Sequence, residues 1–168
     1  GMSATAKISW VDGALFVAEA GSGHTITMDG SPDVGGRNLA ARPMEVVLMG
    51  MGGCTAIDVV SMLKKQRQDI EGVEVSLVAE RADDHPKVFT SVKLVYTVRG
   101  RKLNEALVER AVRLSDGRYC SATAMVKKSA NIKSATQLNG ATICVQPGTT
   151  TELNLSDYFR TKKMAFRP

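Results

Sequence analysis

The sequence contains few of the residues that build metal sites and disulfide frameworks. It has three cysteines, two histidines and one tryptophan among its 168 residues. An odd number of cysteines, with no secretion signal at the start of the chain, argues against a disulfide framework. No CxxC pair occurs, and neither histidine has a second ligand at the spacing of a zinc site. We therefore expect no metal and no cofactor, and a chain that works in the cytoplasm.

Long uncharged runs and dense basic stripes are also missing. The central hydrophobic segment continues for twelve residues, 46–57, without a charged side chain, whereas a membrane-spanning helix needs about 20 apolar residues. The net charge is +5, but five of the 22 basic and only two of the 17 acidic residues follow position 132. No basic stripe recurs at helical spacing, as a nucleic-acid-binding surface would require. The sequence predicts that the chain binds neither membranes nor nucleic acids.

The order of the hydrophobic patterns predicts an α+β fold, because strands and helices come in blocks. Alternating apolar residues predict the strands, and a proline at the first helical position begins a long central helix. This helix is apolar on nearly every side, so we expect it to be buried. The pattern is β-β-β-α-β-β-α-α, with strands at 4–10, 15–20, 24–28, 73–80 and 88–98 and helices at 43–68, 104–115 and 120–130.

Two cysteines are candidates for redox chemistry. Cys54 follows two glycines inside the central helix, and Cys120 begins a later helix beside Arg118. A helix N-terminus and a nearby cation both lower the pKa of a thiol. A thiolate attacks a peroxide to form a sulfenic acid, and a second thiol condenses with it to a disulfide. That scheme requires the two Cα atoms to lie within about 7 Å. The alternative is that each cysteine is a packed, unreactive side chain.

Two segments resemble the OsmC/Ohr family of osmotically induced and organic-hydroperoxide-resistance proteins. They are PMEVVLMGMGGCTAIDVV at 43–60 and RYCS at 118–121, and the resemblance extends over about residues 4–132. It implies an OsmC-like fold, an intertwined homodimer with active sites at the interface, and a stress-response peroxidase that reduces organic hydroperoxides. Cys54 would be the peroxidatic residue and Cys120 the resolving one. A dithiol, a lipoyl group in some members, would reduce their disulfide.

The sequence departs from the family at two supporting positions. Family peroxidases carry an arginine on the early hairpin. The corresponding hairpin of this chain has no arginine, and Lys7 is its only basic residue. They also carry a glutamate directly after the helix-opening proline, where Met44 stands here and the glutamate, Glu45, comes one residue later. Nine helical residues separate Glu45 from Cys54 and place them on opposite faces. Glu45 is therefore a candidate to serve the partner subunit.

Arg42 and Arg37, in the loop before the central helix, are the candidates to replace the missing arginine. The predicted catalytic set is Cys54, Cys120, Glu45 and Arg42, with Arg37 as the alternative cation. The other interpretation of the function is a non-catalytic dimeric module that binds a small apolar or electrophilic ligand at the subunit interface. An apolar lining around Cys54 favours an organic ligand in either case.

The chain stops resembling this family at about Lys133. From there on it resembles an internal segment of periplasmic amino-acid-binding proteins, but it lacks the two lobes that enclose an amino acid. We predict an OsmC-like domain at 1–138 and a fusion-derived extension at 139–168. The extension is expected to contain a strand at 141–146, with Cys144 buried in it, and a helix that begins near Thr151.

Overall fold

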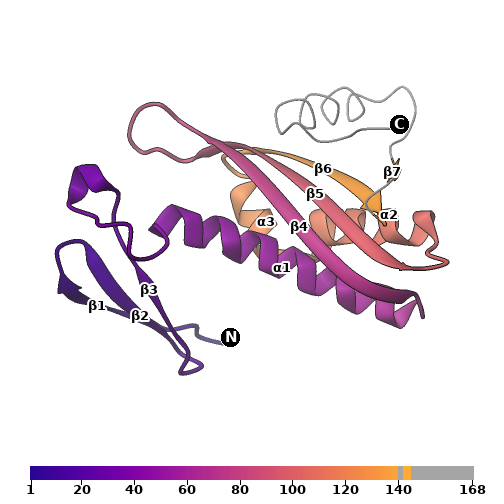
Figure 1. The fold of residues 1–168 in the computed structure, drawn as a ribbon, viewed down its shortest axis with the longest axis horizontal. Coiled ribbons are helices and arrows are strands. Elements are labelled where there is room, and N and C mark those ends of the chain that lie inside the picture. The colour runs from indigo at the N-terminus through magenta and orange to yellow at the C-terminus, as the bar shows by residue number, and fades with distance from the viewer. Residues whose placement is uncertain (140–141, 145–168) are drawn as a thin grey trace. The chain divides into compact units, whose positions relative to one another are not determined.

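The structure is a computed structural model that describes residues 1–139 and 142–144 (Figure 1). The chain divides into two compact units, Gly1–Met49 and Gly50–Pro168, and each is described by itself. Helix α1, Pro43–Lys65, begins in the first unit and ends in the second.

The first unit is built on a three-stranded antiparallel sheet in the order β1-β2-β3. Its strands are β1 (Ala6–Asp12), β2 (Leu15–Ala20) and β3 (Thr25–Met28), which confirms the three strands predicted here. Gly13, between the first two strands, has a φ of 52°, a conformation that glycine adopts without a steric penalty. The indole N–H of Trp10 donates to the carbonyl oxygen of Gly13 at 2.9 Å and closes this turn.

Strand β1 is exposed along its whole length in the single chain. The alternation of apolar residues predicted a half-buried strand, yet the side chains of Ile8 and Trp10 are 52% and 67% exposed. Alternation indicates that one face of a strand is suited to burial, but it does not tell which surface covers that face. Here no part of the described chain buries it.

A buried carboxylate organises the loop between β3 and α1, which includes the short 3-10 helix η1 (Pro32–Val34). Asp29 accepts hydrogen bonds from the backbone N–H groups of Gly30, Arg37 and Leu39, at 2.9, 3.0 and 3.2 Å. These donors, that of Arg37 first, lower the pKa of Asp29 and keep its carboxylate ionised. The loop therefore has a defined shape although it contains little regular structure.

The second unit contains a four-stranded mixed sheet in the order β4-β5-β6-β7. Its strands are β4 (Asp69–Arg81), β5 (Phe89–Arg101), β6 (Asn131–Leu138) and β7 (Thr142–Cys144). The β4–β5 and β6–β7 pairs are antiparallel, whereas β5 and β6 are parallel. Parallel neighbours need a crossover connection, and the segment between β5 and β6 supplies it. Strand β6 was not predicted from the sequence.

Three consecutive helical elements form that crossover. Helix α2 (Glu105–Leu114) begins at Asn104, whose side chain accepts a hydrogen bond from the backbone N–H of Leu107 at 3.3 Å. A π-helical turn, η2 (Ser115–Tyr119), continues directly from α2, and the short α3 (Ser121–Val126) follows. The helix was expected to stop after α2, but the wider turn carries the chain on. Single π-turns of this kind are frequent at functional sites.

The core of the second unit lies around β5. Alternate residues of this strand point to the same face of the sheet, and α1 and α2 contribute buried aliphatic side chains to the same core. The fully buried apolar side chains of these elements are Met51, Val59, Leu63, Val92, Leu94, Tyr96, Val98 and Val108.

Only one stripe of α1 is buried in the single chain, although the sequence predicted a helix covered on every side. Its buried residues, mostly four positions apart, are Met51, Gly52, Thr55, Val59 and Leu63. Val47, Met49 and Ile57 are 47%, 57% and 72% exposed. A helix that is apolar all round carries no periodic signal that marks its buried side, and for this reason the sequence did not indicate which stripe the single chain buries.

Helix α1 is long and apolar enough to span a membrane, judged by length and composition alone. The core helix of a globular protein meets the same criterion, and α1 contributes to the core described above. The expectation that the chain has no membrane-spanning helix stays a prediction.

The structure describes only the beginning of the C-terminal extension. Strand β7 lies within the strand predicted at 141–146 and pairs with β6 at the edge of the sheet. The side chain of Cys144 and the predicted helix near Thr151 lie outside the part of the chain that the structure describes. The boundary at 138/139 stays a prediction.

Candidate functional site

The structure brings the two candidate cysteines together in the second unit. Cys54 lies on α1 and is half-buried, and Cys120 is buried at the N-cap of α3. The Cys54 thiol is near enough to Cys120 to contribute to the raised pKa of that thiol. Both residues are free thiols in this structure. Two cysteines that are 66 positions apart in the sequence are therefore neighbours in the fold.

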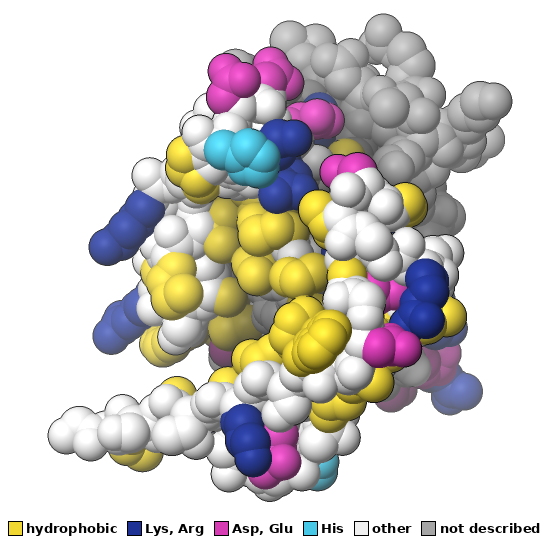
Figure 2. All heavy atoms as spheres, turned by 90° about the vertical axis from the view of Figure 1, so that its left-hand side faces the viewer, with side chains coloured by type: hydrophobic (Ala, Val, Ile, Leu, Met, Phe, Trp, Pro, Cys, Tyr) yellow, Lys and Arg dark blue, Asp and Glu magenta, His cyan; other side chains and the backbone are white. Residues whose placement is uncertain are grey.

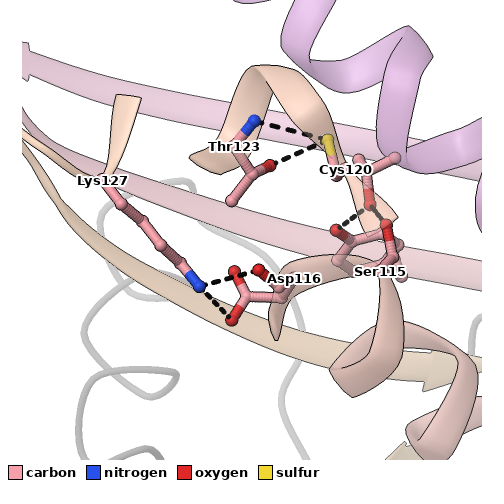
Figure 3. Close-up of polar contacts among 7 residues, drawn as sticks. Ser115, Asp116, Cys120, Thr123 and Lys127 are labelled. Carbon is pink, nitrogen blue, oxygen red and sulfur yellow. Dashed lines mark hydrogen bonds and ion pairs between the residues drawn. The ribbon is translucent and has the colours of Figure 1, made fainter. Parts of the chain in front are cut away.

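Cys120 lies in a small polar environment made by its own helix (Figure 3). The hydroxyl and the backbone N–H of Thr123 both donate to the sulfur of Cys120, at 3.0 and 3.4 Å. Burial nevertheless raises the pKa of the Cys120 thiol, the Thr123 donors oppose this, and Cys54 adds to the increase. The sequence predicted a lowered pKa, and this was wrong because burial outweighs the donors. Arg118 is exposed and lies over the ring of Tyr119, 5.3 Å from its centre.

A line of buried hydroxyl groups runs beside the two cysteines. The Thr55 hydroxyl is 2.7 Å from the Tyr96 hydroxyl and 2.7 Å from the Ser115 hydroxyl. Ser115 in turn donates to a carboxylate oxygen of Asp58 at 2.8 Å. Thr55 directly follows Cys54 in the sequence, and Ser115 begins the turn that leads to Cys120. Sequence reasoning missed this network, because single threonine, serine and tyrosine residues carry no recognisable motif.

Tyr96 is the most strongly perturbed group of the network. Its side chain is 1% exposed, and burial is the main cause that raises the pKa of its phenol from 10.0 to about 12. A phenol that holds its proton more tightly in the folded than in the unfolded chain contributes fully to stability below pH 10.

We expect the free energy of unfolding to fall by about 2–3 kcal/mol between pH 10 and pH 12, as the unfolded chain loses the Tyr96 proton first. Urea denaturation at a series of pH values measures this loss. Tyr96→Phe is the control, because it lacks the titrating group while the lysines and other tyrosines remain. Equal pH dependence of the two proteins would contradict the prediction.

The other predicted site residues lie in the first unit, where each has a local contact or position. Glu45 accepts a hydrogen bond from the backbone N–H of Arg42 at 2.8 Å, which is half of a capping box at the start of α1. The Arg42 side chain is exposed and forms no ion pair within the described residues. Arg37 is paired with the carboxylate of Asp12. The catalytic roles of Glu45, Arg42 and Arg37 stay predictions.

The described residues offer no arrangement of three or more histidine, cysteine, aspartate or glutamate side chains that could hold a metal ion.

Part of the chain's C-terminal region is similar to amino-acid-binding proteins. A segment is 61% identical over 44 residues to the general L-amino acid-binding periplasmic protein AapJ of Rhizobium johnstonii, covering 26% of this chain but 13% of AapJ. The resemblance of the tail to this class of protein is confirmed for this segment. So small a part of AapJ carries no conclusion about amino-acid binding.

The greater part of the chain is similar to proteins of one family. The profile of the family described as OsmC-like protein matches residues 35–135. Protein YhfA of Escherichia coli is 48% identical over 127 residues, which cover 76% of this chain and 92% of YhfA.

Solved structures share the fold. A hypothetical protein from Aquifex aeolicus is 32% identical, with a TM-score of 0.72 over 83% of this chain and 98% of its own. An organic hydroperoxide resistance protein from Elizabethkingia anophelis is 15% identical, with a TM-score of 0.61 over 82% and 97% of the two chains. The second likeness is one of fold alone. The α+β fold predicted from the sequence is confirmed, and the chain belongs to the OsmC-like protein family.

Proposed function

We propose that this protein reduces organic hydroperoxides through a disulfide cycle between Cys54 and Cys120. The observation that carries the proposal is the proximity of the two cysteines in one unit of the fold: Thr55, directly after Cys54, is hydrogen-bonded to Ser115 of the turn that ends at Cys120, and Cys54 contributes to the raised pKa of Cys120. Membership of the OsmC-like family and the shared fold with organic hydroperoxide resistance proteins support it. Neighbouring thiols on a helix and on a turn form the minimum set for a peroxidatic and a resolving residue.

The first step uses Cys54, because its side chain is half-buried whereas Cys120 is 2% exposed. The Cys54 thiolate attacks the terminal oxygen of ROOH, the O–O bond breaks, and the leaving alkoxide takes a proton to become ROH. Cys54 is then a sulfenic acid. The two electrons that reduce the peroxide come from the sulfur of Cys54.

The second step uses the Cys120 thiol. Its sulfur attacks the sulfenic sulfur, the S–OH bond breaks, and water leaves with the Cys120 proton. A disulfide between Cys54 and Cys120 results. An external dithiol, of which a protein-bound lipoyl group is one type, then reduces the disulfide to two thiols and becomes a disulfide itself. In this proposal the cycle runs in the cytoplasm, where such dithiols are kept reduced.

The proposal includes a homodimer, and the exposed apolar surface supports it. Ile8 and Trp10 of the first unit and Ile57 of the second are half or more exposed, and each is a large side chain. Hydrophobic side chains lie openly on the face drawn in Figure 2. Large apolar side chains that a strand and a helix leave exposed are suited to a protein–protein contact. A partner subunit would also bring a second copy of Glu45 and Arg42 to the assembly.

A second candidate function is the binding of a small apolar or electrophilic ligand without turnover. A groove of about 500 Å³ in the first unit favours it. Apolar side chains and one carboxylate line this groove, namely Leu39, Ala40, Ala41, Leu48, Met49 and Glu45, together with Asn38. A groove of this size and lining fits a small organic molecule.

The intact mass of the reduced protein after one equivalent of cumene hydroperoxide distinguishes the two functions. The peroxidase predicts a rapid loss of two hydrogens in the wild type, a sulfenic acid in Cys120→Ser, and no change in Cys54→Ser. Unchanged masses in all three proteins would exclude the peroxidase and leave ligand binding. Oxidation of Cys54→Ser alone would reverse the assignment of the two roles.

A further inference from the structure

A single line of hydrogen bonds connects the helix that carries Cys54 to the turn that carries Cys120. Ser115 donates its only hydroxyl proton to Asp58. The bond between Ser115 and Thr55 must then use the Thr55 proton, and the bond between Thr55 and Tyr96 must use the Tyr96 proton. The line therefore runs in one direction, from Tyr96 through Thr55 and Ser115 to the carboxylate. Each of the three hydroxyl groups donates its single proton to one hydrogen bond of the line.

The turn that this line holds is closed on its other side by separate contacts (Figure 3). The backbone N–H of Cys120 donates to the carbonyl oxygen of Ser115 at 2.8 Å. Lys127, just after α3, reaches back with its ammonium group to the carbonyl oxygen and the carboxylate of Asp116, at 2.7 and 3.1 Å. The Thr123 hydroxyl contacts the Cys120 sulfur. These contacts hold the turn and α3 together as one piece, but they do not attach that piece to α1.

Within the described residues, Ser115 makes the side-chain hydrogen bonds that join the turn to α1. This residue is fully buried, and its hydroxyl contacts two residues of α1, one directly after Cys54 and one a single helical turn further on. A disulfide forms only when the two Cβ atoms approach to about 3.5–4.5 Å. A small shift of the turn along α1 is therefore enough to separate the sulfurs beyond bonding distance.

We infer that Ser115, with Thr55 and Asp58, is a positioning residue that holds the Cys120 turn against α1 so that its thiol meets Cys54. The inference rests on the proposed function for its biological meaning, because a resolving cysteine must meet the peroxidatic one. None of the three side chains reacts. Their contribution is to raise the effective concentration of one thiol at the other.

Equilibration of the full-length protein in buffers of reduced and oxidised glutathione measures that effective concentration. The protein dithiol and oxidised glutathione give the protein disulfide and two reduced glutathiones. Acid quenching, alkylation and intact mass determine the disulfide fraction. We expect Ser115→Ala and Thr55→Val each to lower the equilibrium constant roughly three- to tenfold, because each breaks the line of hydrogen bonds. Thr55→Ser keeps the hydroxyl and should restore the wild-type value.

Thr97→Val is the matched control. The Thr97 hydroxyl also makes one hydrogen bond, 3.5 Å long, to Gln137 in the same sheet, and it belongs to no contact with the Cys120 turn. The Thr97→Val substitution should lower the free energy of unfolding without changing the glutathione equilibrium. An equal decrease in Thr97→Val and Ser115→Ala would overturn the inference, because it would reflect stability alone. An unchanged constant in Ser115→Ala, or no disulfide in the wild type, would overturn it as well.

This experiment uses no peroxide, so it can fail or succeed apart from the proposed function. A wild-type protein inert to cumene hydroperoxide would contradict the peroxidase. If the same protein lost disulfide formation on Ser115→Ala but not on Thr97→Val, the positioning role would be supported.

Discussion

Cys54→Ser is expected to lower the rate constant for cumene hydroperoxide reduction by at least roughly 10³-fold, the scale of loss when a catalytic nucleophile is removed. A serine hydroxyl is a much weaker nucleophile than a thiolate, and activating it would need an adjacent base. Peroxide consumption in the presence of a dithiol, followed as a function of enzyme concentration, measures the rate constant. A Cys54→Ser protein that keeps a tenth of the activity would contradict the assignment of Cys54 as the attacking residue.

Cys120→Ser is the informative companion of that variant. Loss of the resolving thiol should leave the first oxidation of Cys54 within about threefold of the wild-type rate, since Cys120 is not consumed in that step. Excess peroxide should then carry Cys54 on to the sulfinic acid, which a dithiol does not reduce. Wild-type turnover in Cys120→Ser would instead indicate that an external thiol resolves the sulfenic acid directly.

Ile57→Lys is expected to weaken the proposed homodimer strongly. Ile57 is 72% exposed in the single chain and lies on a helix whose other exposed side chains include Val47 and Met49. If a partner covers this helix, a lysine there places a charge in an apolar contact. Substitution of a central interface residue costs about 2–4 kcal/mol, so the dissociation constant should rise by roughly 30- to 1,000-fold.

Sedimentation equilibrium over a range of protein concentrations measures the dissociation constant. Met125→Lys is the matched control, because Met125 is 70% exposed in the same unit but stands on the short α3. It should leave the constant unchanged. A monomeric wild type would exclude the dimer, and a dimer that Ile57→Lys leaves intact would place the contact elsewhere.

The sequence was sufficient to predict most elements of the fold, because their periodicities are strong. The strands from Leu15 and Thr25 and the start of α1 at Pro43 lie where alternation and proline chemistry placed them. Strand β6 escaped prediction because its fully buried end lacks the polar alternation of a half-buried strand. The exposed side of α1 was not predicted either, because a helix that is apolar on every side has no periodic pattern that distinguishes its buried from its exposed face.

The two cysteines of the candidate site that the sequence predicted lie within the two recognisable segments, 43–60 and 118–121. The pairing of Cys54 with Cys120 stays a prediction, made from their local environments and from a resemblance, since two residues 66 positions apart have no local signal of contact. The raised pKa of Cys120 was not predictable, because it depends on burial that only the folded chain defines. The role of Ser115 was invisible for the same reason. Its partners come from α1, which lies more than fifty positions earlier in the sequence.

Strand β7 shows how a segment beyond the predicted domain boundary can continue the sheet of the second unit. Without it, β6 would leave a row of unpaired backbone groups at the margin of the sheet, which invites association with other chains. The pairing of Thr142–Cys144 with Thr136–Leu138 is made by main-chain atoms, and main-chain atoms are the same in every sequence. A short extended segment of almost any ancestry can therefore pair with the last three residues of β6. Evolution can exchange such a segment at little cost to the domain that carries the thiols.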